Sequence, residues 1–262
     1  MTAAEIKWKC NRYQIKNFTI NSDGSIDVYG DVNFYDEELF KLPLKFKRVS
    51  GYFICSRNQL TSLEGCPVIV GGDFSCDNNR LTSLEGCPSK VGGHFKCKDN
   101  RLTSLNGGPH TVDGNFDCYG NDLTSLVGGP KIVGGDYECA YNKLTSLEGS
   151  TTNVGGDFNC NNSKLTSLNG GPETVGGNFR CNGNQLTSLI GAPTKVGGDF
   201  NCEWNDLTSI EGINQVSGYF SCNRNQLTSL EGINQVSGKI FADGDLLRIY
   251  NRTQTIRAIL ES

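Results

Sequence analysis

The sequence of 262 residues has little of what marks a membrane protein, a secreted protein or a nucleic-acid-binding protein. No apolar run approaches the roughly 20 residues that span a bilayer, and the start of the chain lacks the apolar core and cleavage site of a signal peptide. The formal charge is -4, whereas binding to a phosphate backbone needs clustered Lys and Arg. We therefore expect no nucleic-acid partner, no membrane and a cytoplasmic location.

Glycine is abundant, with 33 residues, and its positions follow a repeat. Cysteines at positions 55, 76, 97, 118, 139, 160, 181, 202 and 222 are separated by 21 residues, except for the last interval of 20. The unit around each cysteine reads V-G-G-D-F-x-C-x-x-N-x-L-T-S-L-x-G-x-P-x-x, as at residues 70–90, and most glycines occupy its turns. The glycine excess therefore indicates an array of regular turns and not a disordered chain.

The spacing F-x-C-x-x-N-x-L-x-x-L resembles the core of a leucine-rich repeat, with Phe and Cys in the first two apolar positions. Over residues 49–240 the chain is similar to the short bacterial type of this repeat. The resemblance implies a mainly β repeat solenoid with a curved parallel sheet, in which Phe and Cys point inward from each strand. Where that family has a further Leu this chain has Gly, so a plain parallel β-solenoid is the alternative.

The beginning of the chain carries a second resemblance. Residues 13–28 and 42–46, followed by the repeats, are similar to a group of leucine-rich-repeat-like proteins encoded by tailed bacteriophages. The resemblance covers nearly the whole chain but brings no known activity with it. It implies a phage-encoded protein that acts in the cytoplasm of a bacterial host.

We expect three regions along the chain. Residues 1–48 form an N-terminal cap, made of a β-hairpin around Asp23 and Gly24 and a degenerate repeat. Residues 49–238 contain nine repeats of 20–21 residues, and residues 239–262 form a C-terminal cap. Caps cover the apolar faces and strand edges of the terminal units. Short amphipathic helices are predicted at the end by Leu246, Leu247, Ile249, Tyr250, Ile256, Ile259 and Leu260.

An asparagine follows each repeat cysteine by three residues and is expected to hydrogen-bond backbone groups where the chain bends away from the strand. Ser163 interrupts this series, and its hydroxyl is shorter and has one donor instead of two. We predict a local weak point in that unit. The series consists of Asn58, Asn79, Asn100, Asn121, Asn142, Asn184, Asn205 and Asn225.

The periodic cysteines are expected to pack as small buried hydrophobes in a reducing compartment, because they belong to different units and no C-x-x-C pair is present. Cys66 and Cys87 share one loop position in consecutive units, where a disulfide, a thiol pair or simple small-residue packing are all open, the last being favoured. No Ser-His-Asp or Cys-His arrangement can be assembled around the two histidines. We predict a chain that is not an enzyme and holds no metal or cofactor.

Functional residues should lie where the repeat does not dictate the residue, at the positions flanking Phe and Cys, which form the concave face of leucine-rich repeats. Exposed aromatic residues are predicted there, and aromatic residues are typical interface anchors. A small basic patch is predicted beside an acidic group, while paired carboxylates are expected to be solvated. The candidate partner-binding residues are Tyr119, Tyr141, Trp204, His94, Lys96, Lys98, Asp117, Asp136, Glu138 and Arg180.

These observations favour a non-enzymatic module that binds a host or phage protein through the concave face. Inhibition of a host protein, with antiviral defence as the candidate, follows from analogy with phage proteins. The alternative is a structural or assembly component, or a homo-oligomer, that uses its edges or convex loops. A weaker alternative is a protein that sequesters a small ligand near Tyr119, Tyr141 and Lys96.

Overall fold

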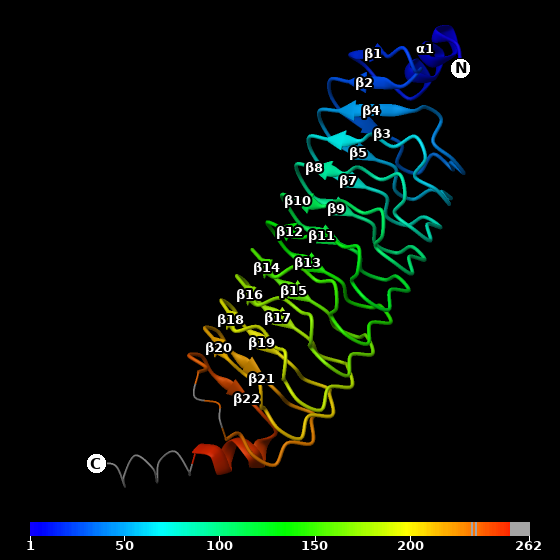
Figure 1. Ribbon diagram of the computed structural model, residues 1–262. Helices are drawn as coiled ribbons and strands as arrows, with labels where there is room; N and C mark the ends of the chain where they lie inside the picture. Colours follow the sequence, from blue (N-terminus) through cyan, green and yellow to red (C-terminus); the bar gives the residue numbers. More distant parts are fainter. Residues whose placement is uncertain (232, 234, 252–262) are drawn as a thin grey trace.

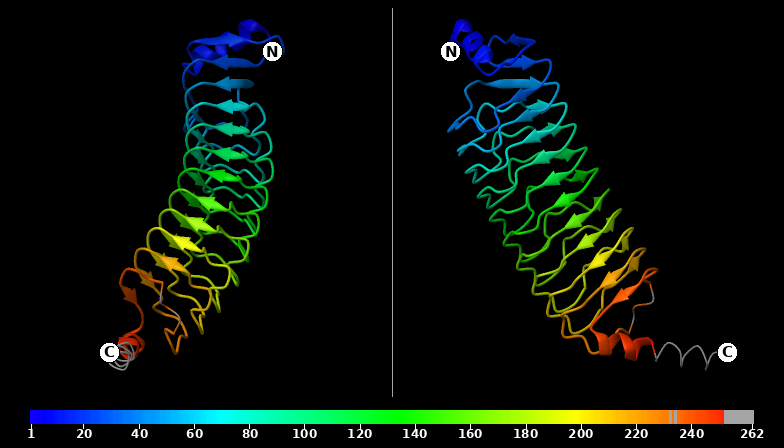
Figure 2. Two further views of the ribbon diagram at one scale, coloured as in Figure 1. Left: turned by 60° about the vertical axis from the view of Figure 1, so that its left-hand side comes forward. Right: turned by 180° about the vertical axis from the view of Figure 1, so that it is seen from behind.

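Each repeat unit contributes two short strands that are joined by the Gly-Gly turn. In the computed structural model, which describes residues 1–231, 233 and 235–251, these strands stack into two sheets along an elongated solenoid (Figure 1). Both sheets have 11 strands and are parallel from unit to unit. The structure confirms the mainly β repeat solenoid, and Figure 2 shows that it curves gently along its length.

Sheet A contains the residues that precede the Gly-Gly turn. Its strands, in spatial order, are β1 (Phe18–Ile20), β2 (Ile26–Val28), β4 (Phe46–Val49), β6 (Ile69–Val70), β8 (Lys90–Val91), β10 (Thr111–Val112), β12 (Ile132–Val133), β14 (Asn153–Val154), β16 (Thr174–Val175), β18 (Lys195–Val196) and β20 (Gln215–Val216). Sheet B contains the residues that follow the turn. Its strands are β3 (Val32–Asn33), β5 (Phe53–Ile54), β7 (Phe74–Ser75), β9 (Phe95–Lys96), β11 (Phe116–Asp117), β13 (Tyr137–Glu138), β15 (Phe158–Asn159), β17 (Phe179–Arg180), β19 (Phe200–Asn201), β21 (Phe220–Ser221) and β22 (Ile240–Phe241).

The core is built from columns of identical residues, one from each unit. The inward rings of sheet B lie with centroids 5.0 to 5.9 Å apart from Phe53 to Phe220. The repeat cysteines and, in most units, the two leucines are almost fully buried behind them, as in Cys76, Leu81 and Leu84. Since one unit has too little apolar surface for a core of its own, burial depends on its neighbours. The predicted inward direction of Phe and Cys is confirmed.

The asparagine ladder is present and joins consecutive units. The Asn79 amide nitrogen donates to the carbonyl oxygens of Cys76 and, in the preceding unit, Cys55, both at 3.0 Å. Its side-chain oxygen accepts from the Leu60 backbone N–H at 2.9 Å. The same pattern, with bonds to its own and to the preceding unit, recurs at every Asn of the series. The predicted hydrogen bonds from the asparagine side chains to backbone groups at the bend are confirmed.

Sheet A accounts for the departure from the leucine-rich-repeat pattern. The valine before each Gly-Gly turn points into the core, as Val70 does, and pairs with the valine of the next unit, Val91. The turn must be tight because the units lie close together there. A Cβ added at Gly71 would overlap the Ser50 carbonyl oxygen of the preceding turn, so glycine is favoured at this position. This second sheet was not predicted, because in the sequence the Val-Gly-Gly segment indicates only a turn.

The N-terminal cap contains a helix that was not predicted, α1 (Ala3–Arg12), followed by the predicted hairpin. The helix begins at a capping box formed by Thr2 and Glu5 and buries Ile6 and Cys10 against the first unit. The hairpin pairs β1 with β2 in antiparallel fashion, and β2 then pairs in parallel with β4. The hairpin therefore covers the edge of sheet A that β4 would otherwise expose at the N-terminal end.

The C-terminal end is covered by a helical segment at residues 244–251 (Figure 1). Leu246 is buried, and Leu247 and Tyr250 pack against the core, whereas Ile249 is exposed. The predicted helical positions Ile256, Ile259 and Leu260 lie outside the described residues.

Ser163 interrupts the ladder in the structure as it does in the sequence. Its hydroxyl is buried and has no hydrogen-bond partner, so it does not replace the bond that asparagine provides to the preceding unit. Asn184 accepts both from the Leu165 N–H and from the Ser163 N–H, each at 3.1 Å. The next asparagine therefore compensates in part for the missing one.

Candidate functional site

The outward side of sheet B offers four columns of side chains that the core does not dictate. They are the residue before each Phe, the residue between Phe and Cys, and the two residues after Cys. We call this surface the sheet-B face. The second and third columns sit on the short strands and their ends, and the fourth has a left-handed backbone in every unit, with φ between 49 and 68°.

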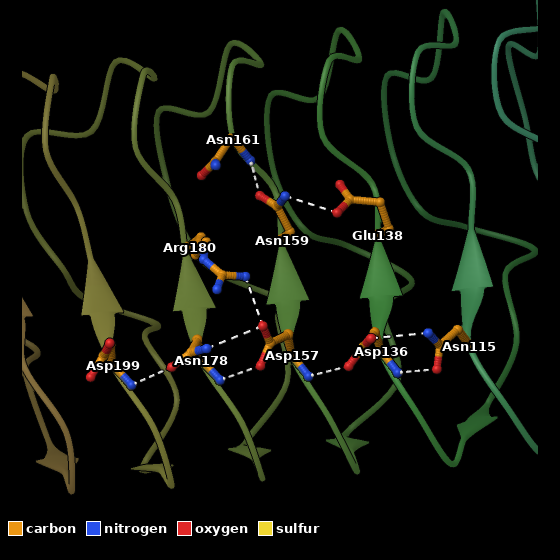
Figure 3. Close-up of polar contacts among 9 residues, drawn as sticks. All are labelled: Asn115, Asp136, Glu138, Asp157, Asn159, Asn161, Asn178, Arg180 and Asp199. Atoms are coloured by element: carbon orange, nitrogen blue, oxygen red, sulfur yellow. Dashed lines mark hydrogen bonds and ion pairs between the residues drawn. The ribbon is translucent and has the colours of Figure 1, made fainter.

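The first column forms a second hydrogen-bond ladder along the solenoid axis (Figure 3). The Asp136 carboxylate accepts from the Asp157 backbone N–H at 2.8 Å, and Asp157 accepts in turn from the Asn178 N–H at 2.7 Å. His94 belongs to the same ladder, because its Nδ1 accepts from the Asn115 N–H at 2.9 Å. His94 and Asp136 were predicted to bind a partner, but each uses an acceptor atom to bond the backbone of the next unit, which helps to hold the solenoid together.

The second column brings several predicted residues side by side. Lys96 pairs in register with Asp117, and Asp117 with Glu138. Glu138 accepts from the Asn159 amide at 2.8 Å (Figure 3). Arg180, at the far end of this row, forms an ion pair with Asp157 at 2.7 Å. The charged row therefore runs from a cation through two adjacent carboxylates to a paired cation.

The carboxylates of this row are less solvated than the sequence suggested. Burial raises the pKa of Asp117, although the nearby Lys98 and Lys96 oppose the rise. Burial likewise raises the pKa of Glu138, against the effect of the Asn159 hydrogen bond. The expectation of ordinary solvated carboxylates was wrong here because both side chains lie half-buried between neighbouring rows.

Tyr119 and Tyr141 come from adjacent units and form one aromatic cluster. Their ring centroids are 5.0 Å apart and the rings are tilted by 46°. Tyr141 is 53% exposed, and Tyr119 is half-buried beside it, less exposed than predicted. The rings stand next to the Asp117 and Glu138 row, so this part of the sheet-B face combines apolar surface with carboxylates.

Trp204 does not join this cluster. It occupies the same column as Tyr141 but three units further along the axis. The Arg224 guanidinium lies 3.9 Å from the centroid of its ring, within the range of a cation–π contact. The ring is 55% exposed, yet one of its faces is already occupied.

A buried polar chain at the near end of the face was missed by sequence reasoning. The Ser56 and Ser75 hydroxyls are hydrogen-bonded to each other, and Ser75 donates to Asp77 at 3.0 Å. The second Asp77 oxygen accepts from the Lys98 backbone N–H at 3.0 Å. Burial raises the pKa of Asp77 to about 6. A hollow of about 310 Å³, lined in part by Lys96, opens above these hydrogen-bonded side chains. The sequence signal that could have predicted this polar group is a pair of serines on the sheet-B face of consecutive units, next to an aspartate.

The other reactive groups of the chain are poorly placed for chemistry. All twelve cysteines are free thiols, including Cys66 and Cys87. Burial raises the pKa of the Cys139 thiol well above its ordinary value, and that of Cys87 to about 12, which disfavours the nucleophilic thiolate. In the described part of the chain, no group of three or more His, Cys, Asp or Glu side chains is placed to hold a metal ion. Over the same residues, we find no helix with the length and apolar character needed to cross a membrane.

Comparison with known proteins gives little further information. No protein-family model and no curated protein sequence matches the chain. Among solved structures, YopM from Yersinia enterocolitica WA-314 is similar, with a TM-score of 0.48 and 16% sequence identity. The match covers 76% of this chain and 57% of the Yersinia protein.

Proposed function

We propose that this chain is a non-enzymatic protein-binding module that docks a partner on the sheet-B face, with Tyr119 and Tyr141 as the anchor. The observation that carries the proposal is the aromatic cluster itself. Two large rings lie together on a surface whose other columns are mostly small or polar, and clustered aromatic side chains are typical of the centre of an interface. The Tyr119 backbone N–H also donates to the half-buried Asp117 carboxylate at 3.1 Å. His94 and Asp136 would then have a supporting role, because they bond neighbouring units together and so fix the position of the strands that carry the two tyrosines.

The backbone at Tyr141 supports a functional reason for the ring. Its φ is 55°, in the left-handed region that asparagine and glycine adopt at the lowest cost. Three other units place Asn78, Asn162 and Gly183 at the same position, so the fold accepts low-cost residues there. The remaining units carry Arg57, Asp99, Gly120, Trp204 and Arg224 with the same left-handed backbone. A tyrosine there costs conformational energy that the fold does not require, and such costs are concentrated at functional sites.

The repeat itself supplies the test variant. Tyr119→Asn with Tyr141→Asn replaces both rings by residues that other units carry at these positions, namely Asn161 and Asn162. We expect the double variant to keep its fold and to lose a specific protein from a pull-down with host or infected-cell lysate. Tyr29→Asn, at an exposed tyrosine of the N-terminal cap, is the matched control and should retain that protein. Equal recovery by all three proteins, or recovery of none, would sink the proposal.

We also propose, from the resemblance at residues 13–28 and 42–46, that the chain is phage-encoded and acts in the bacterial cytoplasm on a host protein, with a component of antiviral defence as the candidate. This step rests on analogy and is separable from the binding proposal. If it holds, the captured protein is encoded by the host, and phage that lack this chain plate less efficiently on a host that carries the defence system. Capture of a phage structural protein, or self-association of the chain in solution, would instead favour the assembly role.

A further inference from the structure

A groove lies in the N-terminal cap, away from the tyrosine anchor, between α1 and the segment that leads into β4. We call it the cap groove and define it by Trp8, Lys9, Arg12, Lys41, Leu42 and Lys45. It has a volume of about 710 Å³, in the range of sites that enclose a ligand or a short peptide. Leu42 is buried and contributes apolar floor, whereas Trp8 on the wall is 62% exposed.

The charge of the cap groove is opposite to that of the chain. The net charge of the protein is -4, but four of the residues that line this groove are cationic, against one carboxylate, Glu64. Lys45 is paired with Asp23 at 3.5 Å. Within the described residues, no carboxylate lies within 4.0 Å of the charged nitrogens of Lys9, Arg12 or Lys41. The cap groove therefore carries positive charge that the rest of the described chain leaves unpaired.

Three contacts hold two of these cations, Lys9 and Arg12, in place. The Lys9 ammonium donates to the Pro43 carbonyl oxygen at 2.8 Å, which ties α1 to the floor of the cap groove. The Arg12 guanidinium lies 6.0 Å from the Trp8 ring centroid and 5.6 Å from that of Tyr13. A guanidinium beside aromatic rings keeps its N–H donors available at its edge, where a carboxylate is bound in bidentate fashion.

From this arrangement we infer that the cap groove is a second binding site, which takes an acidic peptide segment of a partner protein with one apolar side chain between its carboxylates. The carboxylates would meet Arg12 and Lys41, and the apolar side chain would lie on Leu42 and against Trp8. Stacking of nucleic-acid bases is disfavoured, because the Arg12 guanidinium is already beside both rings and the chain as a whole is acidic.

The experiment is a selection of displayed random dodecapeptides on the immobilised full chain, in parallel with Arg12→Glu/Lys41→Glu and a matched control, Lys90→Glu/Lys195→Glu, at exposed lysines of sheet A. We expect wild type and control to enrich peptides with Asp or Glu on both sides of Leu, Phe or Trp, and the groove variant to enrich none. An enriched peptide is then titrated into Trp204→Phe protein, where Trp8 is the remaining tryptophan. Its amide counterpart, with Asn and Gln in place of the acids, should bind at least tenfold more weakly.

Each contrary result overturns the inference. Enrichment of neutral or basic peptides, no enrichment, or equal enrichment on the groove variant would remove the acidic-peptide site. Tighter binding of oligo(dT) than of the peptide, seen through Trp8 fluorescence, would assign the cap groove to nucleic acid instead. The Tyr119→Asn/Tyr141→Asn protein should bind the peptide as wild type does, so this site and the sheet-B face succeed or fail independently.

Discussion

Tyr137 stands in the inward column that is otherwise phenylalanine from Phe53 to Phe220, and its buried hydroxyl has no hydrogen-bond partner. A buried polar group left unpaired costs about 1–3 kcal/mol. We therefore expect Tyr137→Phe to raise the free energy of unfolding by about 1 kcal/mol or more in denaturant titrations. The reverse change in the neighbouring unit, Phe116→Tyr, should lower it. A Tyr137→Phe protein less stable than wild type would show that the hydroxyl is paired.

Asp77 gives the stability a defined pH dependence. Its pKa is raised by burial to about 6 in the folded chain, against an ordinary value of 3.8, so the folded state binds this proton more tightly than the unfolded state. The free energy of unfolding therefore falls as pH rises from about 4 to about 6, by at most about 3 kcal/mol from this group. Asp77→Asn does not titrate. Its stability relative to wild type should increase between pH 4 and pH 7 and stay constant below pH 4.

The measurement is urea unfolding of both proteins at several pH values. Asp117, whose pKa is also raised, is present in both proteins, so its own titration largely cancels in the difference. A difference that does not change with pH would show that Asp77 titrates in its ordinary range.

At the scale of the element, the asparagine ladder is the joint between units, and Ser163 is its gap. Ser163→Asn should restore bonds to Cys160 and Cys139 and to the Leu144 N–H, as Asn142 makes with the corresponding groups one unit earlier. We expect a gain of about 1–2 kcal/mol in stability and slower amide exchange in the two units that meet there. Asn142→Ser is the matched reverse and should cost a similar amount. Equal exchange in all units of wild type would count against the weak point.

Elements could be predicted from the sequence wherever one residue type recurs in one environment. The inward Phe and Cys, the asparagine ladder and the hairpin around Asp23 and Gly24 were predictable because each depends on local spacing. Sheet A was not predictable, because a single Val before two glycines is too short to show the alternation of apolar and polar residues that marks a strand. Its pairing with the next unit is what makes this segment a strand. Helix α1 was missed although its capping box, Thr2 with Glu5, was visible, since only Ile6 and Cys10 mark its apolar side.

The site was predictable in part for the same reason. The register of the repeat placed Tyr119 beside Tyr141, but it could not show that His94 and Asp136 accept backbone hydrogen bonds, because an exposed aspartate and a ladder aspartate look alike in sequence. The cap groove depends on how α1 lies against residues 41–45, which no repeat dictates.

For the whole molecule, the regular stacking predicts that a unit can be added without loss of order. A copy of residues 176–196 inserted after Val196 should lengthen the solenoid by about 4.8 Å, leave it folded and not lower its stability. It also moves Trp204 one turn away from Tyr141. Scattering in solution measures the length, and partner affinity should change by no more than about threefold, because the tyrosine anchor precedes the insertion. A tenfold loss would show that the partner reaches Trp204.

The short reach of the ladder bonds determines how the chain can assemble. Bonds between units join residues 18 to 24 positions apart, such as Leu60 with Asn79 and Asn79 with Cys55. During synthesis, each unit can therefore form its ladder bonds once about one further unit has left the ribosome. The first of these pairings joins β4 to β2, which has already been synthesised. Folding can proceed in the order of synthesis, because each new unit adds its two strands to the two sheets of the units already formed.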